Sequence, residues 1–165
     1  QPAPDAMVLD CGCGGGANIK TLLKLCPNGK VQGIDYSAVS VEKARKVNAR
    51  AIAAGRCTVQ QASVTELPFE AEQFDVATAF ETVYFWPELA QNFREVYRVL
   101  KPGGTFFICN EANGETAKDD KWTQIINGMT IYTDTALKAY LEQAGFCKIQ
   151  SHKNKKGWLC VTAQK

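Results

Sequence analysis

A glycine-rich segment at residues 11–16 constrains the fold of this chain more than any other feature. It follows an expected strand at residues 6–10 and precedes an expected helix at residues 17–25, whose apolar residues recur at helical spacing. Glycines there let the backbone turn tightly and let a ligand approach it closely. In open α/β sheets, ligands bind in the crevice beyond the carboxyl ends of the strands. We therefore expect residues 11–16 to form a ligand-binding loop.

Further strand-like and helical segments alternate along the rest of the chain. The turn at residues 154–157 is too short for a crossover, so the last two strands must be antiparallel. The alternation predicts an α/β fold: a three-layer, doubly wound, mostly parallel sheet of seven strands with a C-terminal antiparallel hairpin. We expect strands at residues 6–10, 30–35, 57–60, 74–80, 105–109, 146–151 and 158–163, helices at 17–25, 38–53, 87–100 and 133–144, and an irregular excursion at 110–132.

Two of these helices carry local signals. Ser37 is placed as the N-cap of the helix at residues 38–53, and Gly55 as its C-terminal glycine. Pro87 suits the first turn of the helix at residues 87–100. The residues of the first of these helices that we expect to face the sheet are Val39, Ala44, Val47 and Ala51.

Two carboxylates stand at expected strand ends. A carboxylate at Asp10, two residues before Gly12, would repel a pyrophosphate and suits a ligand with a cationic end. The alternative is that Asp10 caps backbone N–H groups in the turn. Asp35 is placed to accept hydrogen bonds from ribose hydroxyls, or else to stabilise a helix N-terminus. Gly12, Gly14 and Ala17 satisfy a dinucleotide-binding pattern that does not by itself distinguish NAD from other nucleosides.

Several segments in order resemble the class I (Rossmann-like) S-adenosylmethionine-dependent methyltransferases. Residues 8–16 followed by residues 33–37 are similar to the first two motifs of that family. Residues 67–69, 74–76 and 100–104 continue the likeness, which extends over nearly the whole chain. The resemblance implies the same fold, S-adenosylmethionine as cofactor, S-adenosylhomocysteine as product and methyl transfer as activity.

The resemblance also implies roles for individual residues. Asp10 would lie near the methionine ammonium, and Asp35 would hold the ribose. Ser63 stands where relatives often carry an acid for the adenine amino group, a departure that weakens this contact. The residues expected to bind the cofactor are Asp10, Gly12, Cys13, Gly14, Asn18, Asp35, Tyr36, Ser63, Val64 and Phe80. For Tyr36, ordinary packing in the core is the alternative.

Methyl transfer needs alignment of two reactants and exclusion of water, with a base only if the acceptor must lose a proton. Glu81 and Glu111 are candidate bases, with solvated loop residues as the alternative, and His152 is a weaker candidate. Substrate pockets are often lined by aromatic side chains. We expect such a role for Tyr84, Trp86, Trp122 and Tyr132; the alternative is that half or more of the aromatic residues here simply cover the edge of the sheet.

Composition narrows the partners and the compartment. A net charge of +2 gives no broad electrostatic surface for nucleic acid. Seven scattered cysteines favour a reducing compartment, hence the cytoplasm, and the pair Cys11 and Cys13 is only half of a zinc site, so we expect no metal. No apolar run is long enough to cross a membrane. We expect a small-molecule acceptor, with RNA or protein as less favoured alternatives; the oligomeric state is not indicated.

A length of 165 residues is typical of one domain, so we expect residues 1–165 to form a single methyltransferase domain. Only residues 1–5 precede the first expected strand. Many small-molecule methyltransferases of the family carry a helical cap there, which implies either a missing cap or an open site. Two rival functions are an NAD(P)-binding oxidoreductase domain and a non-catalytic methyltransferase-like binding protein.

Overall fold

The computed structural model describes residues 2–115 and 117–165 and contains a seven-stranded sheet in the order β3-β2-β1-β4-β5-β7-β6. Strands β1 to β5 run parallel, and β7 runs antiparallel to both β5 and β6. The predicted fold class and its closing hairpin are therefore confirmed. The strands are β1 (Met7–Cys11), β2 (Lys30–Asp35), β3 (Cys57–Gln61), β4 (Phe74–Phe80), β5 (Leu100–Asn110), β6 (Cys147–Lys153) and β7 (Leu159–Gln164).

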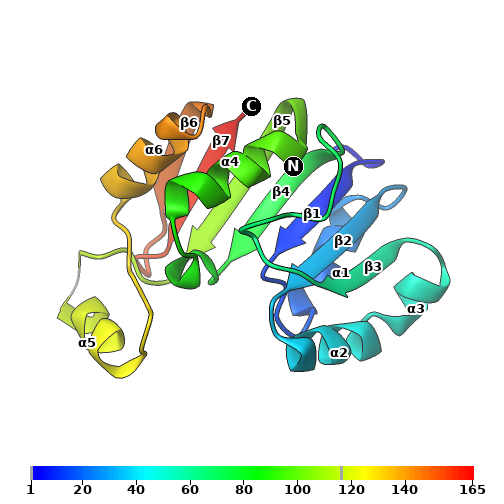
Figure 1. Cartoon of the computed structure of the whole chain (residues 1–165), viewed down its shortest axis with the longest axis horizontal. Helices are drawn as coiled ribbons and strands as arrows, with labels where there is room; N and C mark the ends of the chain where they lie inside the picture. Colours follow the sequence, from blue (N-terminus) through cyan, green and yellow to red (C-terminus); the bar gives the residue numbers. More distant parts are fainter. Residues whose placement is uncertain (1, 116) are drawn as a thin grey trace.

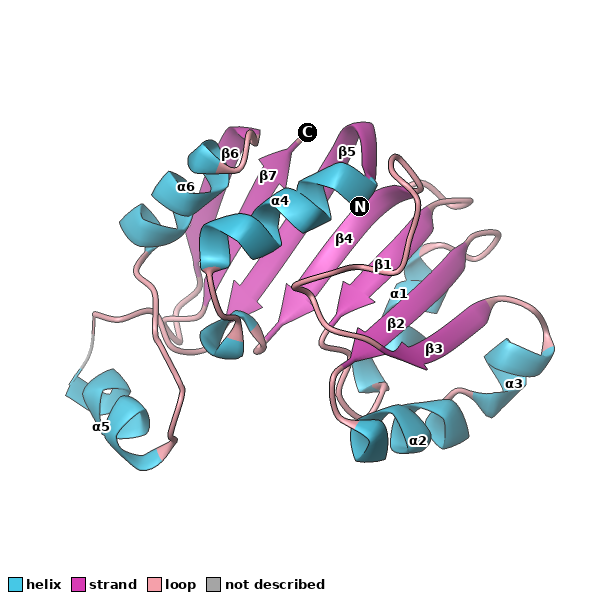
Figure 2. Cartoon of the chain, viewed as in Figure 1, coloured by secondary structure: helices cyan, strands magenta, loops and turns pink. Residues whose placement is uncertain are grey.

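Helices cover the two faces of this sheet at different ends. Helices α4 (Leu89–Val99) and α6 (Asp134–Gln143) pack on one face over β5, β7 and β6 (Figure 1). Helices α1 (Ala17–Leu25) and α2 (Ala38–Val47) pack on the other face, near β2 and β3 (Figure 2). The short α3 (Ala49–Ala53) follows α2, the 3-10 helix η1 (Val83–Phe85) follows β4, and α5 (Ala117–Ile125) stands away from the sheet.

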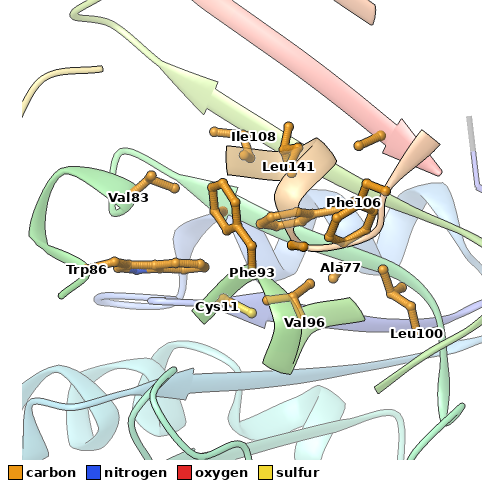
Figure 3. Packing of buried hydrophobic residues seen from close by; sticks show 14 of the residues in the cluster. Cys11, Ala77, Val83, Trp86, Phe93, Val96, Leu100, Phe106, Ile108 and Leu141 are labelled. Atoms are coloured by element: carbon orange, nitrogen blue, oxygen red, sulfur yellow. The ribbon is translucent and has the colours of Figure 1, made fainter. Parts of the chain in front are cut away.

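The alternation of side chains along each strand divides the core between these two faces. In β1, Val8 packs in the cluster beneath α1 and α2, whereas Leu9 packs in the cluster beneath α4 and α6. Aromatic rings fill the second cluster, where Phe93 of α4 meets Phe106 of β5 edge-on at 5.5 Å between ring centroids (Figure 3). Burying one such ring contributes about 1.5–3 kcal/mol, so α4 is held firmly over the sheet.

The predicted helix at residues 38–53 is wrong in one respect, because it is broken at Asn48. The backbone of Asn48 leaves the helical region, and its side chain donates to the carbonyls of Ala44 and Gly16 at 2.9 and 3.0 Å. The predicted inner face is also partly wrong: Val39 is 78% exposed and Val47 is exposed, whereas Val41 and Ala44 are buried. Ser37 is the N-cap as predicted and accepts from the Ser40 N–H.

Both ends of the helix predicted at residues 87–100 also differ from prediction. Pro87 lies before α4, because the chain enters this helix through Glu88 in a left-handed conformation and the helix begins at Leu89. Leu100 belongs to β5 instead of the helix. The excursion at residues 110–132 contains α5, whose weak periodicity matches its exposure: Trp122 is 50% exposed and the last helical residue, Ile125, is 71% exposed.

Candidate active site

The glycine-rich loop lies beyond the carboxyl end of β1 and is tied to β2. The backbone N–H groups of Gly12 and Cys13 donate to the Ile34 carbonyl at 2.9 and 2.8 Å. The Gly14 N–H donates to Oδ2 of Asp35 at 2.9 Å. Gly12 has a φ of 73°, and a β-carbon there would lie 2.1 Å from Oγ1 of Thr82. Only glycine fits this position without displacing Thr82.

Asp10 lies beneath this loop and is almost completely buried. Its Oδ1 accepts a hydrogen bond from the Thr78 hydroxyl at 2.8 Å, while its Oδ2 is buried without a hydrogen-bond partner. Burial raises the pKa of Asp10 to about 7; the Thr78 hydrogen bond opposes this shift and the charge of Asp35 adds to it. A buried carboxylate oxygen without a partner is costly, so the site suits a ligand that brings a cationic donor.

Asp35 closes the other side of the loop. Its Oδ2 accepts from the Gly14 N–H and its Oδ1 from the Ser37 N–H, both at 2.9 Å. Since a carboxylate offers about four acceptor positions, two remain for a ligand. The hydrogen bond from the Ser37 N–H agrees with a role of Asp35 at the helix N-terminus. The two remaining acceptor positions are available to ribose hydroxyls.

Five of the residues predicted to bind cofactor line one cavity of about 420 Å³, here named the Asp35 cavity. Tyr36 is 78% exposed, so the alternative that it is a core residue is wrong. The Ser63 hydroxyl also contacts that of Thr65 at 2.8 Å. The five predicted residues that line the Asp35 cavity are Gly12, Asp35, Tyr36, Ser63 and Val64. The same cavity is also lined by Thr82, Phe85 and Trp86, and by Asn127 and Gly128 of the excursion.

Two predicted cofactor residues lie elsewhere. Asn18 and Phe80 line a separate cavity of about 440 Å³ together with Thr78, the hydrogen-bond partner of Asp10. We name it the Thr78 cavity. Cys13 is buried, and its sulfur faces Gly33 of β2, so only its backbone is presented to the loop. The predicted set is therefore divided between two cavities.

A third cavity of about 580 Å³, the Glu81 cavity, brings together both candidate bases and two predicted substrate residues. Glu81 follows β4 in a left-handed conformation with φ 56°. Its Oε1 accepts from the Glu111 N–H at 2.5 Å, and its Oε2 accepts from the Tyr84 hydroxyl at 3.3 Å. Burial raises the pKa of Glu81 and that of Tyr84. Trp122, Lys156 and Trp158 also line this cavity.

The remaining predicted residues lie outside these three cavities. Tyr132 packs edge-on against Tyr140, with 5.9 Å between ring centroids. His152 is exposed on β6, opposite Cys160. Neither side chain is among the residues that line the cavities in the described parts of the chain.

Sequence reasoning missed several residues that shape the site. Thr78 had a signal, since it is the one hydroxyl residue in the otherwise apolar residues 76–80 of β4, a strand that pairs with β1. Thr82 could not be predicted, because its close approach to Gly12 has no signal in the sequence. Within the described residues, no helix is both long and apolar enough to cross a bilayer.

Several known proteins are similar to this chain in sequence. A family model described as "Methyltransferase domain" matches residues 9–108. The 24-methylenesterol C-methyltransferase 2 of Arabidopsis thaliana is 30% identical over 131 residues, which cover 78% of this chain and 36% of that protein. Sterol methyltransferase-like 2 of Botryococcus braunii is 37% identical over 105 residues, covering 64% of this chain and 27% of that protein. The chain thus spans about a third of the length of these relatives.

A solved structure shares the fold. The S-adenosylmethionine-dependent methyltransferase from Aquifex aeolicus superposes with a TM-score of 0.81 and 22% identity, covering 96% of this chain and 81% of that one. The family model, the sheet order and the loop beneath which Asp10 is buried agree with one another. The chain therefore belongs to the methyltransferase-domain family and has the fold of the class I S-adenosylmethionine-dependent methyltransferases.

Proposed function

We propose that this domain transfers a methyl group from S-adenosylmethionine to a small-molecule acceptor held in the Glu81 cavity. The observation that carries the proposal is the unpartnered, buried Oδ2 of Asp10 beneath a glycine-rich loop. A carboxylate there favours the α-ammonium of the cofactor and disfavours a pyrophosphate. An NAD(P)-binding function is therefore not favoured. The intact loop and Asp35 likewise argue against a non-catalytic binding protein.

The cofactor would lie across the loop. Asp10 would meet its ammonium group, and Asn18 and Phe80 line the cavity on that side. Asp35 would accept from the ribose hydroxyls at the mouth of the Asp35 cavity, with Tyr36 on the adenine. Ser63 and Val64 would border the base. S-adenosylmethionine supplies a methyl group already activated by the sulfonium, so the protein needs no covalent nucleophile.

The acceptor would approach from the neighbouring cavity. Glu81 lines the Glu81 cavity while Thr82 lines the Asp35 cavity, and Tyr84 and Phe85 are divided in the same way. Residues 81–85 therefore contribute side chains to both cavities, which supports transfer between them. If the acceptor must lose a proton, Glu81 is a candidate to take it, because burial raises the pKa of its carboxyl, although the hydrogen bonds from the Glu111 N–H and the Tyr84 hydroxyl oppose this shift.

The names of the relatives support a small-molecule acceptor. The curated relatives cited above are named sterol methyltransferases. The near-balanced charge of this chain supports neither RNA nor DNA as acceptor. All seven cysteines are free thiols, which supports a reducing compartment and hence the cytoplasm.

Calorimetric titration with S-adenosylhomocysteine tests the cofactor site. We expect low micromolar binding to the wild type and its loss in Asp35→Ala, with Asp5→Ala as a matched control because Asp5 is exposed. Asp35→Asn keeps one carbonyl oxygen for the loop and should bind weakly without unfolding. Binding of NAD in place of S-adenosylhomocysteine would overturn the proposal.

Incorporation of a labelled methyl group tests the acceptor. A panel of sterols, other alkenes, phenols and amines is incubated with labelled S-adenosylmethionine, and methylated products are detected by mass spectrometry. We expect product from a small-molecule class, reduced by Trp122→Ala, which removes a half-exposed ring from the Glu81 cavity. Methylation of RNA or protein alone would overturn the assignment of a small-molecule acceptor while leaving the cofactor site intact.

A further inference from the structure

Two cysteines face each other on the neighbouring antiparallel strands β5 and β7. Cys109 of β5 and Cys160 of β7 are direct cross-strand partners in the antiparallel register. The thiol of Cys160 donates to the sulfur of Cys109 at 3.3 Å. Other cysteine thiols donate to backbone carbonyls instead: Cys26 to Leu22, Cys57 to Thr58 and Cys147 to Gln164. The strand register thus places the sulfur atoms of Cys109 and Cys160 next to each other.

Solutes can reach this pair because it lies on the less covered face of the sheet. In β5, Phe106 and Ile108 are buried under α4 and α6, whereas Cys109 lies on the opposite face and is half-buried. In β7, Val161 is fully buried and Cys160 is half-buried. By contrast, Cys11, Cys13, Cys26 and Cys57 are buried.

We propose that Cys109 and Cys160 form a redox-active dithiol, which a mild oxidant such as hydrogen peroxide converts to a reversible cross-strand disulfide. Directly opposed residues of an antiparallel pair have their α-carbons about 4.5–5.5 Å apart. That range lies within the roughly 4.4–6.8 Å found for disulfides. The bond therefore needs rotation of two side chains and no change of register.

The step balances with one peroxide for each pair. Burial raises the pKa of Cys109 to about 12, so the Cys109 thiol is a poor nucleophile at neutral pH. The sulfur of Cys160 attacks the peroxide, the O–O bond breaks, and a sulfenic acid and one water form. The sulfur of Cys109 then displaces the hydroxyl group, which leaves as a second water with the Cys109 proton. Two thiols are oxidised and one peroxide is reduced.

The cysteine pair lies close to residues that line the Glu81 cavity, so its oxidation goes beyond the proposed function but concerns the same part of the molecule. Cys109 is two residues before Glu111, and Cys160 is two residues after Trp158, and both of these residues line the Glu81 cavity. The carbonyl of Cys109 also accepts from the Glu81 N–H at 3.0 Å. The disulfide would join β5 to β7 next to the floor of that cavity.

Peptide mapping tests the proposal without any measurement of methyl transfer. The protein is treated with hydrogen peroxide, remaining thiols are blocked with N-ethylmaleimide, and the chain is digested with trypsin. Cleavage at Arg98 and Lys118 releases Cys109 in peptide 99–118, and cleavage at Lys156 releases Cys160 in peptide 157–165. We expect these peptides joined, with a mass two hydrogen atoms below their sum, and separated again by dithiothreitol.

Two variants sharpen the result. Cys160→Ser should abolish the joined peptide and leave Cys109 open to the maleimide, whereas Cys147→Ser should change nothing, since Cys147 is exposed on β6. Circular dichroism before oxidation establishes that each variant is folded. Recovery of both wild-type peptides unjoined, at peroxide concentrations that oxidise Cys147, would overturn the proposal. So would a disulfide that joins Cys160 to any other cysteine.

Discussion

The hydroxyl of Thr78 donates to Oδ1 of Asp10 at 2.8 Å, whereas Oδ2 of the same buried carboxyl has no partner. The two residues are on the neighbouring strands β1 and β4. Burial raises the pKa of Asp10 to about 7, with Asp35 as the charged neighbour that adds to the shift. Near neutral pH, the proton on Asp10 is therefore held loosely enough for a ligand to displace it.

Binding of S-adenosylhomocysteine should depend on this proton. The ligand ammonium favours the ionised carboxylate, so below about pH 7 binding must release the proton from Asp10. We expect the dissociation constant to fall by up to about tenfold for each pH unit between about pH 5 and pH 7, and then to level off. Calorimetry in buffers of different ionisation enthalpy measures the released proton directly.

Asp10→Asn is the control for that prediction. It keeps an oxygen for the Thr78 hydroxyl but has no proton to release, so its binding should be weaker and flat across the same range of pH. A wild-type protein that binds equally well at pH 5 and pH 7.5 would show that Asp10 does not face the ammonium.

Thr78→Val should move the midpoint of that pH dependence upward. The substitution keeps the shape of the side chain but removes the hydrogen bond that lowers the pKa of Asp10. A hydrogen bond to a charged group contributes about 1.5–3 kcal/mol, which corresponds to roughly one pH unit or more. The measurement is the same calorimetric series, and an unchanged midpoint would contradict the assigned role of Thr78.

The contribution of Asp10 to the stability of the ligand-free domain should decrease with rising pH, whereas ligand binding should become tighter. An acid whose pKa is raised on folding binds more protons in the native state than in the unfolded state between its two pKa values. The Asp10 contribution therefore favours folding less as pH rises from about 4 to about 7. Urea unfolding at several pH values should show Asp10→Asn gaining stability over wild type across this window. Asp75 and Glu95, whose pKa values are lowered, titrate alike in the wild type and in Asp10→Asn. Their contributions to the free energy of unfolding therefore cancel when the two proteins are compared.

Gly12→Ala should abolish cofactor binding and destabilise the domain. The left-handed backbone costs a non-glycine residue about 1–2 kcal/mol, and the contact with Thr82 adds to this cost. The double variant Gly12→Ala/Thr82→Gly removes the contact but keeps the backbone strain. Urea unfolding should therefore show partial recovery, with a favourable coupling energy between the two positions. Additive losses would mean that the two residues do not touch.

The sequence predicted those parts of the site that depend on strand ends. Parallel strands end at the same edge of the sheet, so Asp10 and Asp35 had to lie near the glycine-rich loop. The structure bears this out through the contact between Gly14 and Asp35. The sheet followed from alternation of apolar strands and helices, a signal that is repeated along the chain and survives local errors.

Contacts between distant residues could not be predicted in this way. Asn18 and Phe80 line a different cavity from Asp35, because the Thr78 cavity is lined mainly by α1 and by side chains of β1, β4, β5 and β7. No periodic pattern in the sequence reports such a division. Helix α5 was missed because it buries little apolar surface. The break at Asn48 depends on a partner 32 residues away, Gly16, whose carbonyl has no distinguishing signal in the sequence.

The stability of the domain should depend on Asn48, the residue at this break. The side-chain amide of Asn48 is buried and donates to the carbonyls of Gly16 and Ala44. Asn48→Ala leaves both without these bonds and should cost about 1–3 kcal/mol in urea unfolding. Asn48→Asp should cost more, because it places a carboxylate against two carbonyl oxygens. Asn28→Ala, at an exposed residue, is the matched control. Since Gly16 is the N-cap of α1 and ends the glycine-rich loop, weaker S-adenosylhomocysteine binding should accompany the loss. Unchanged stability in Asn48→Ala would mean that the amide does not hold the loop against α2.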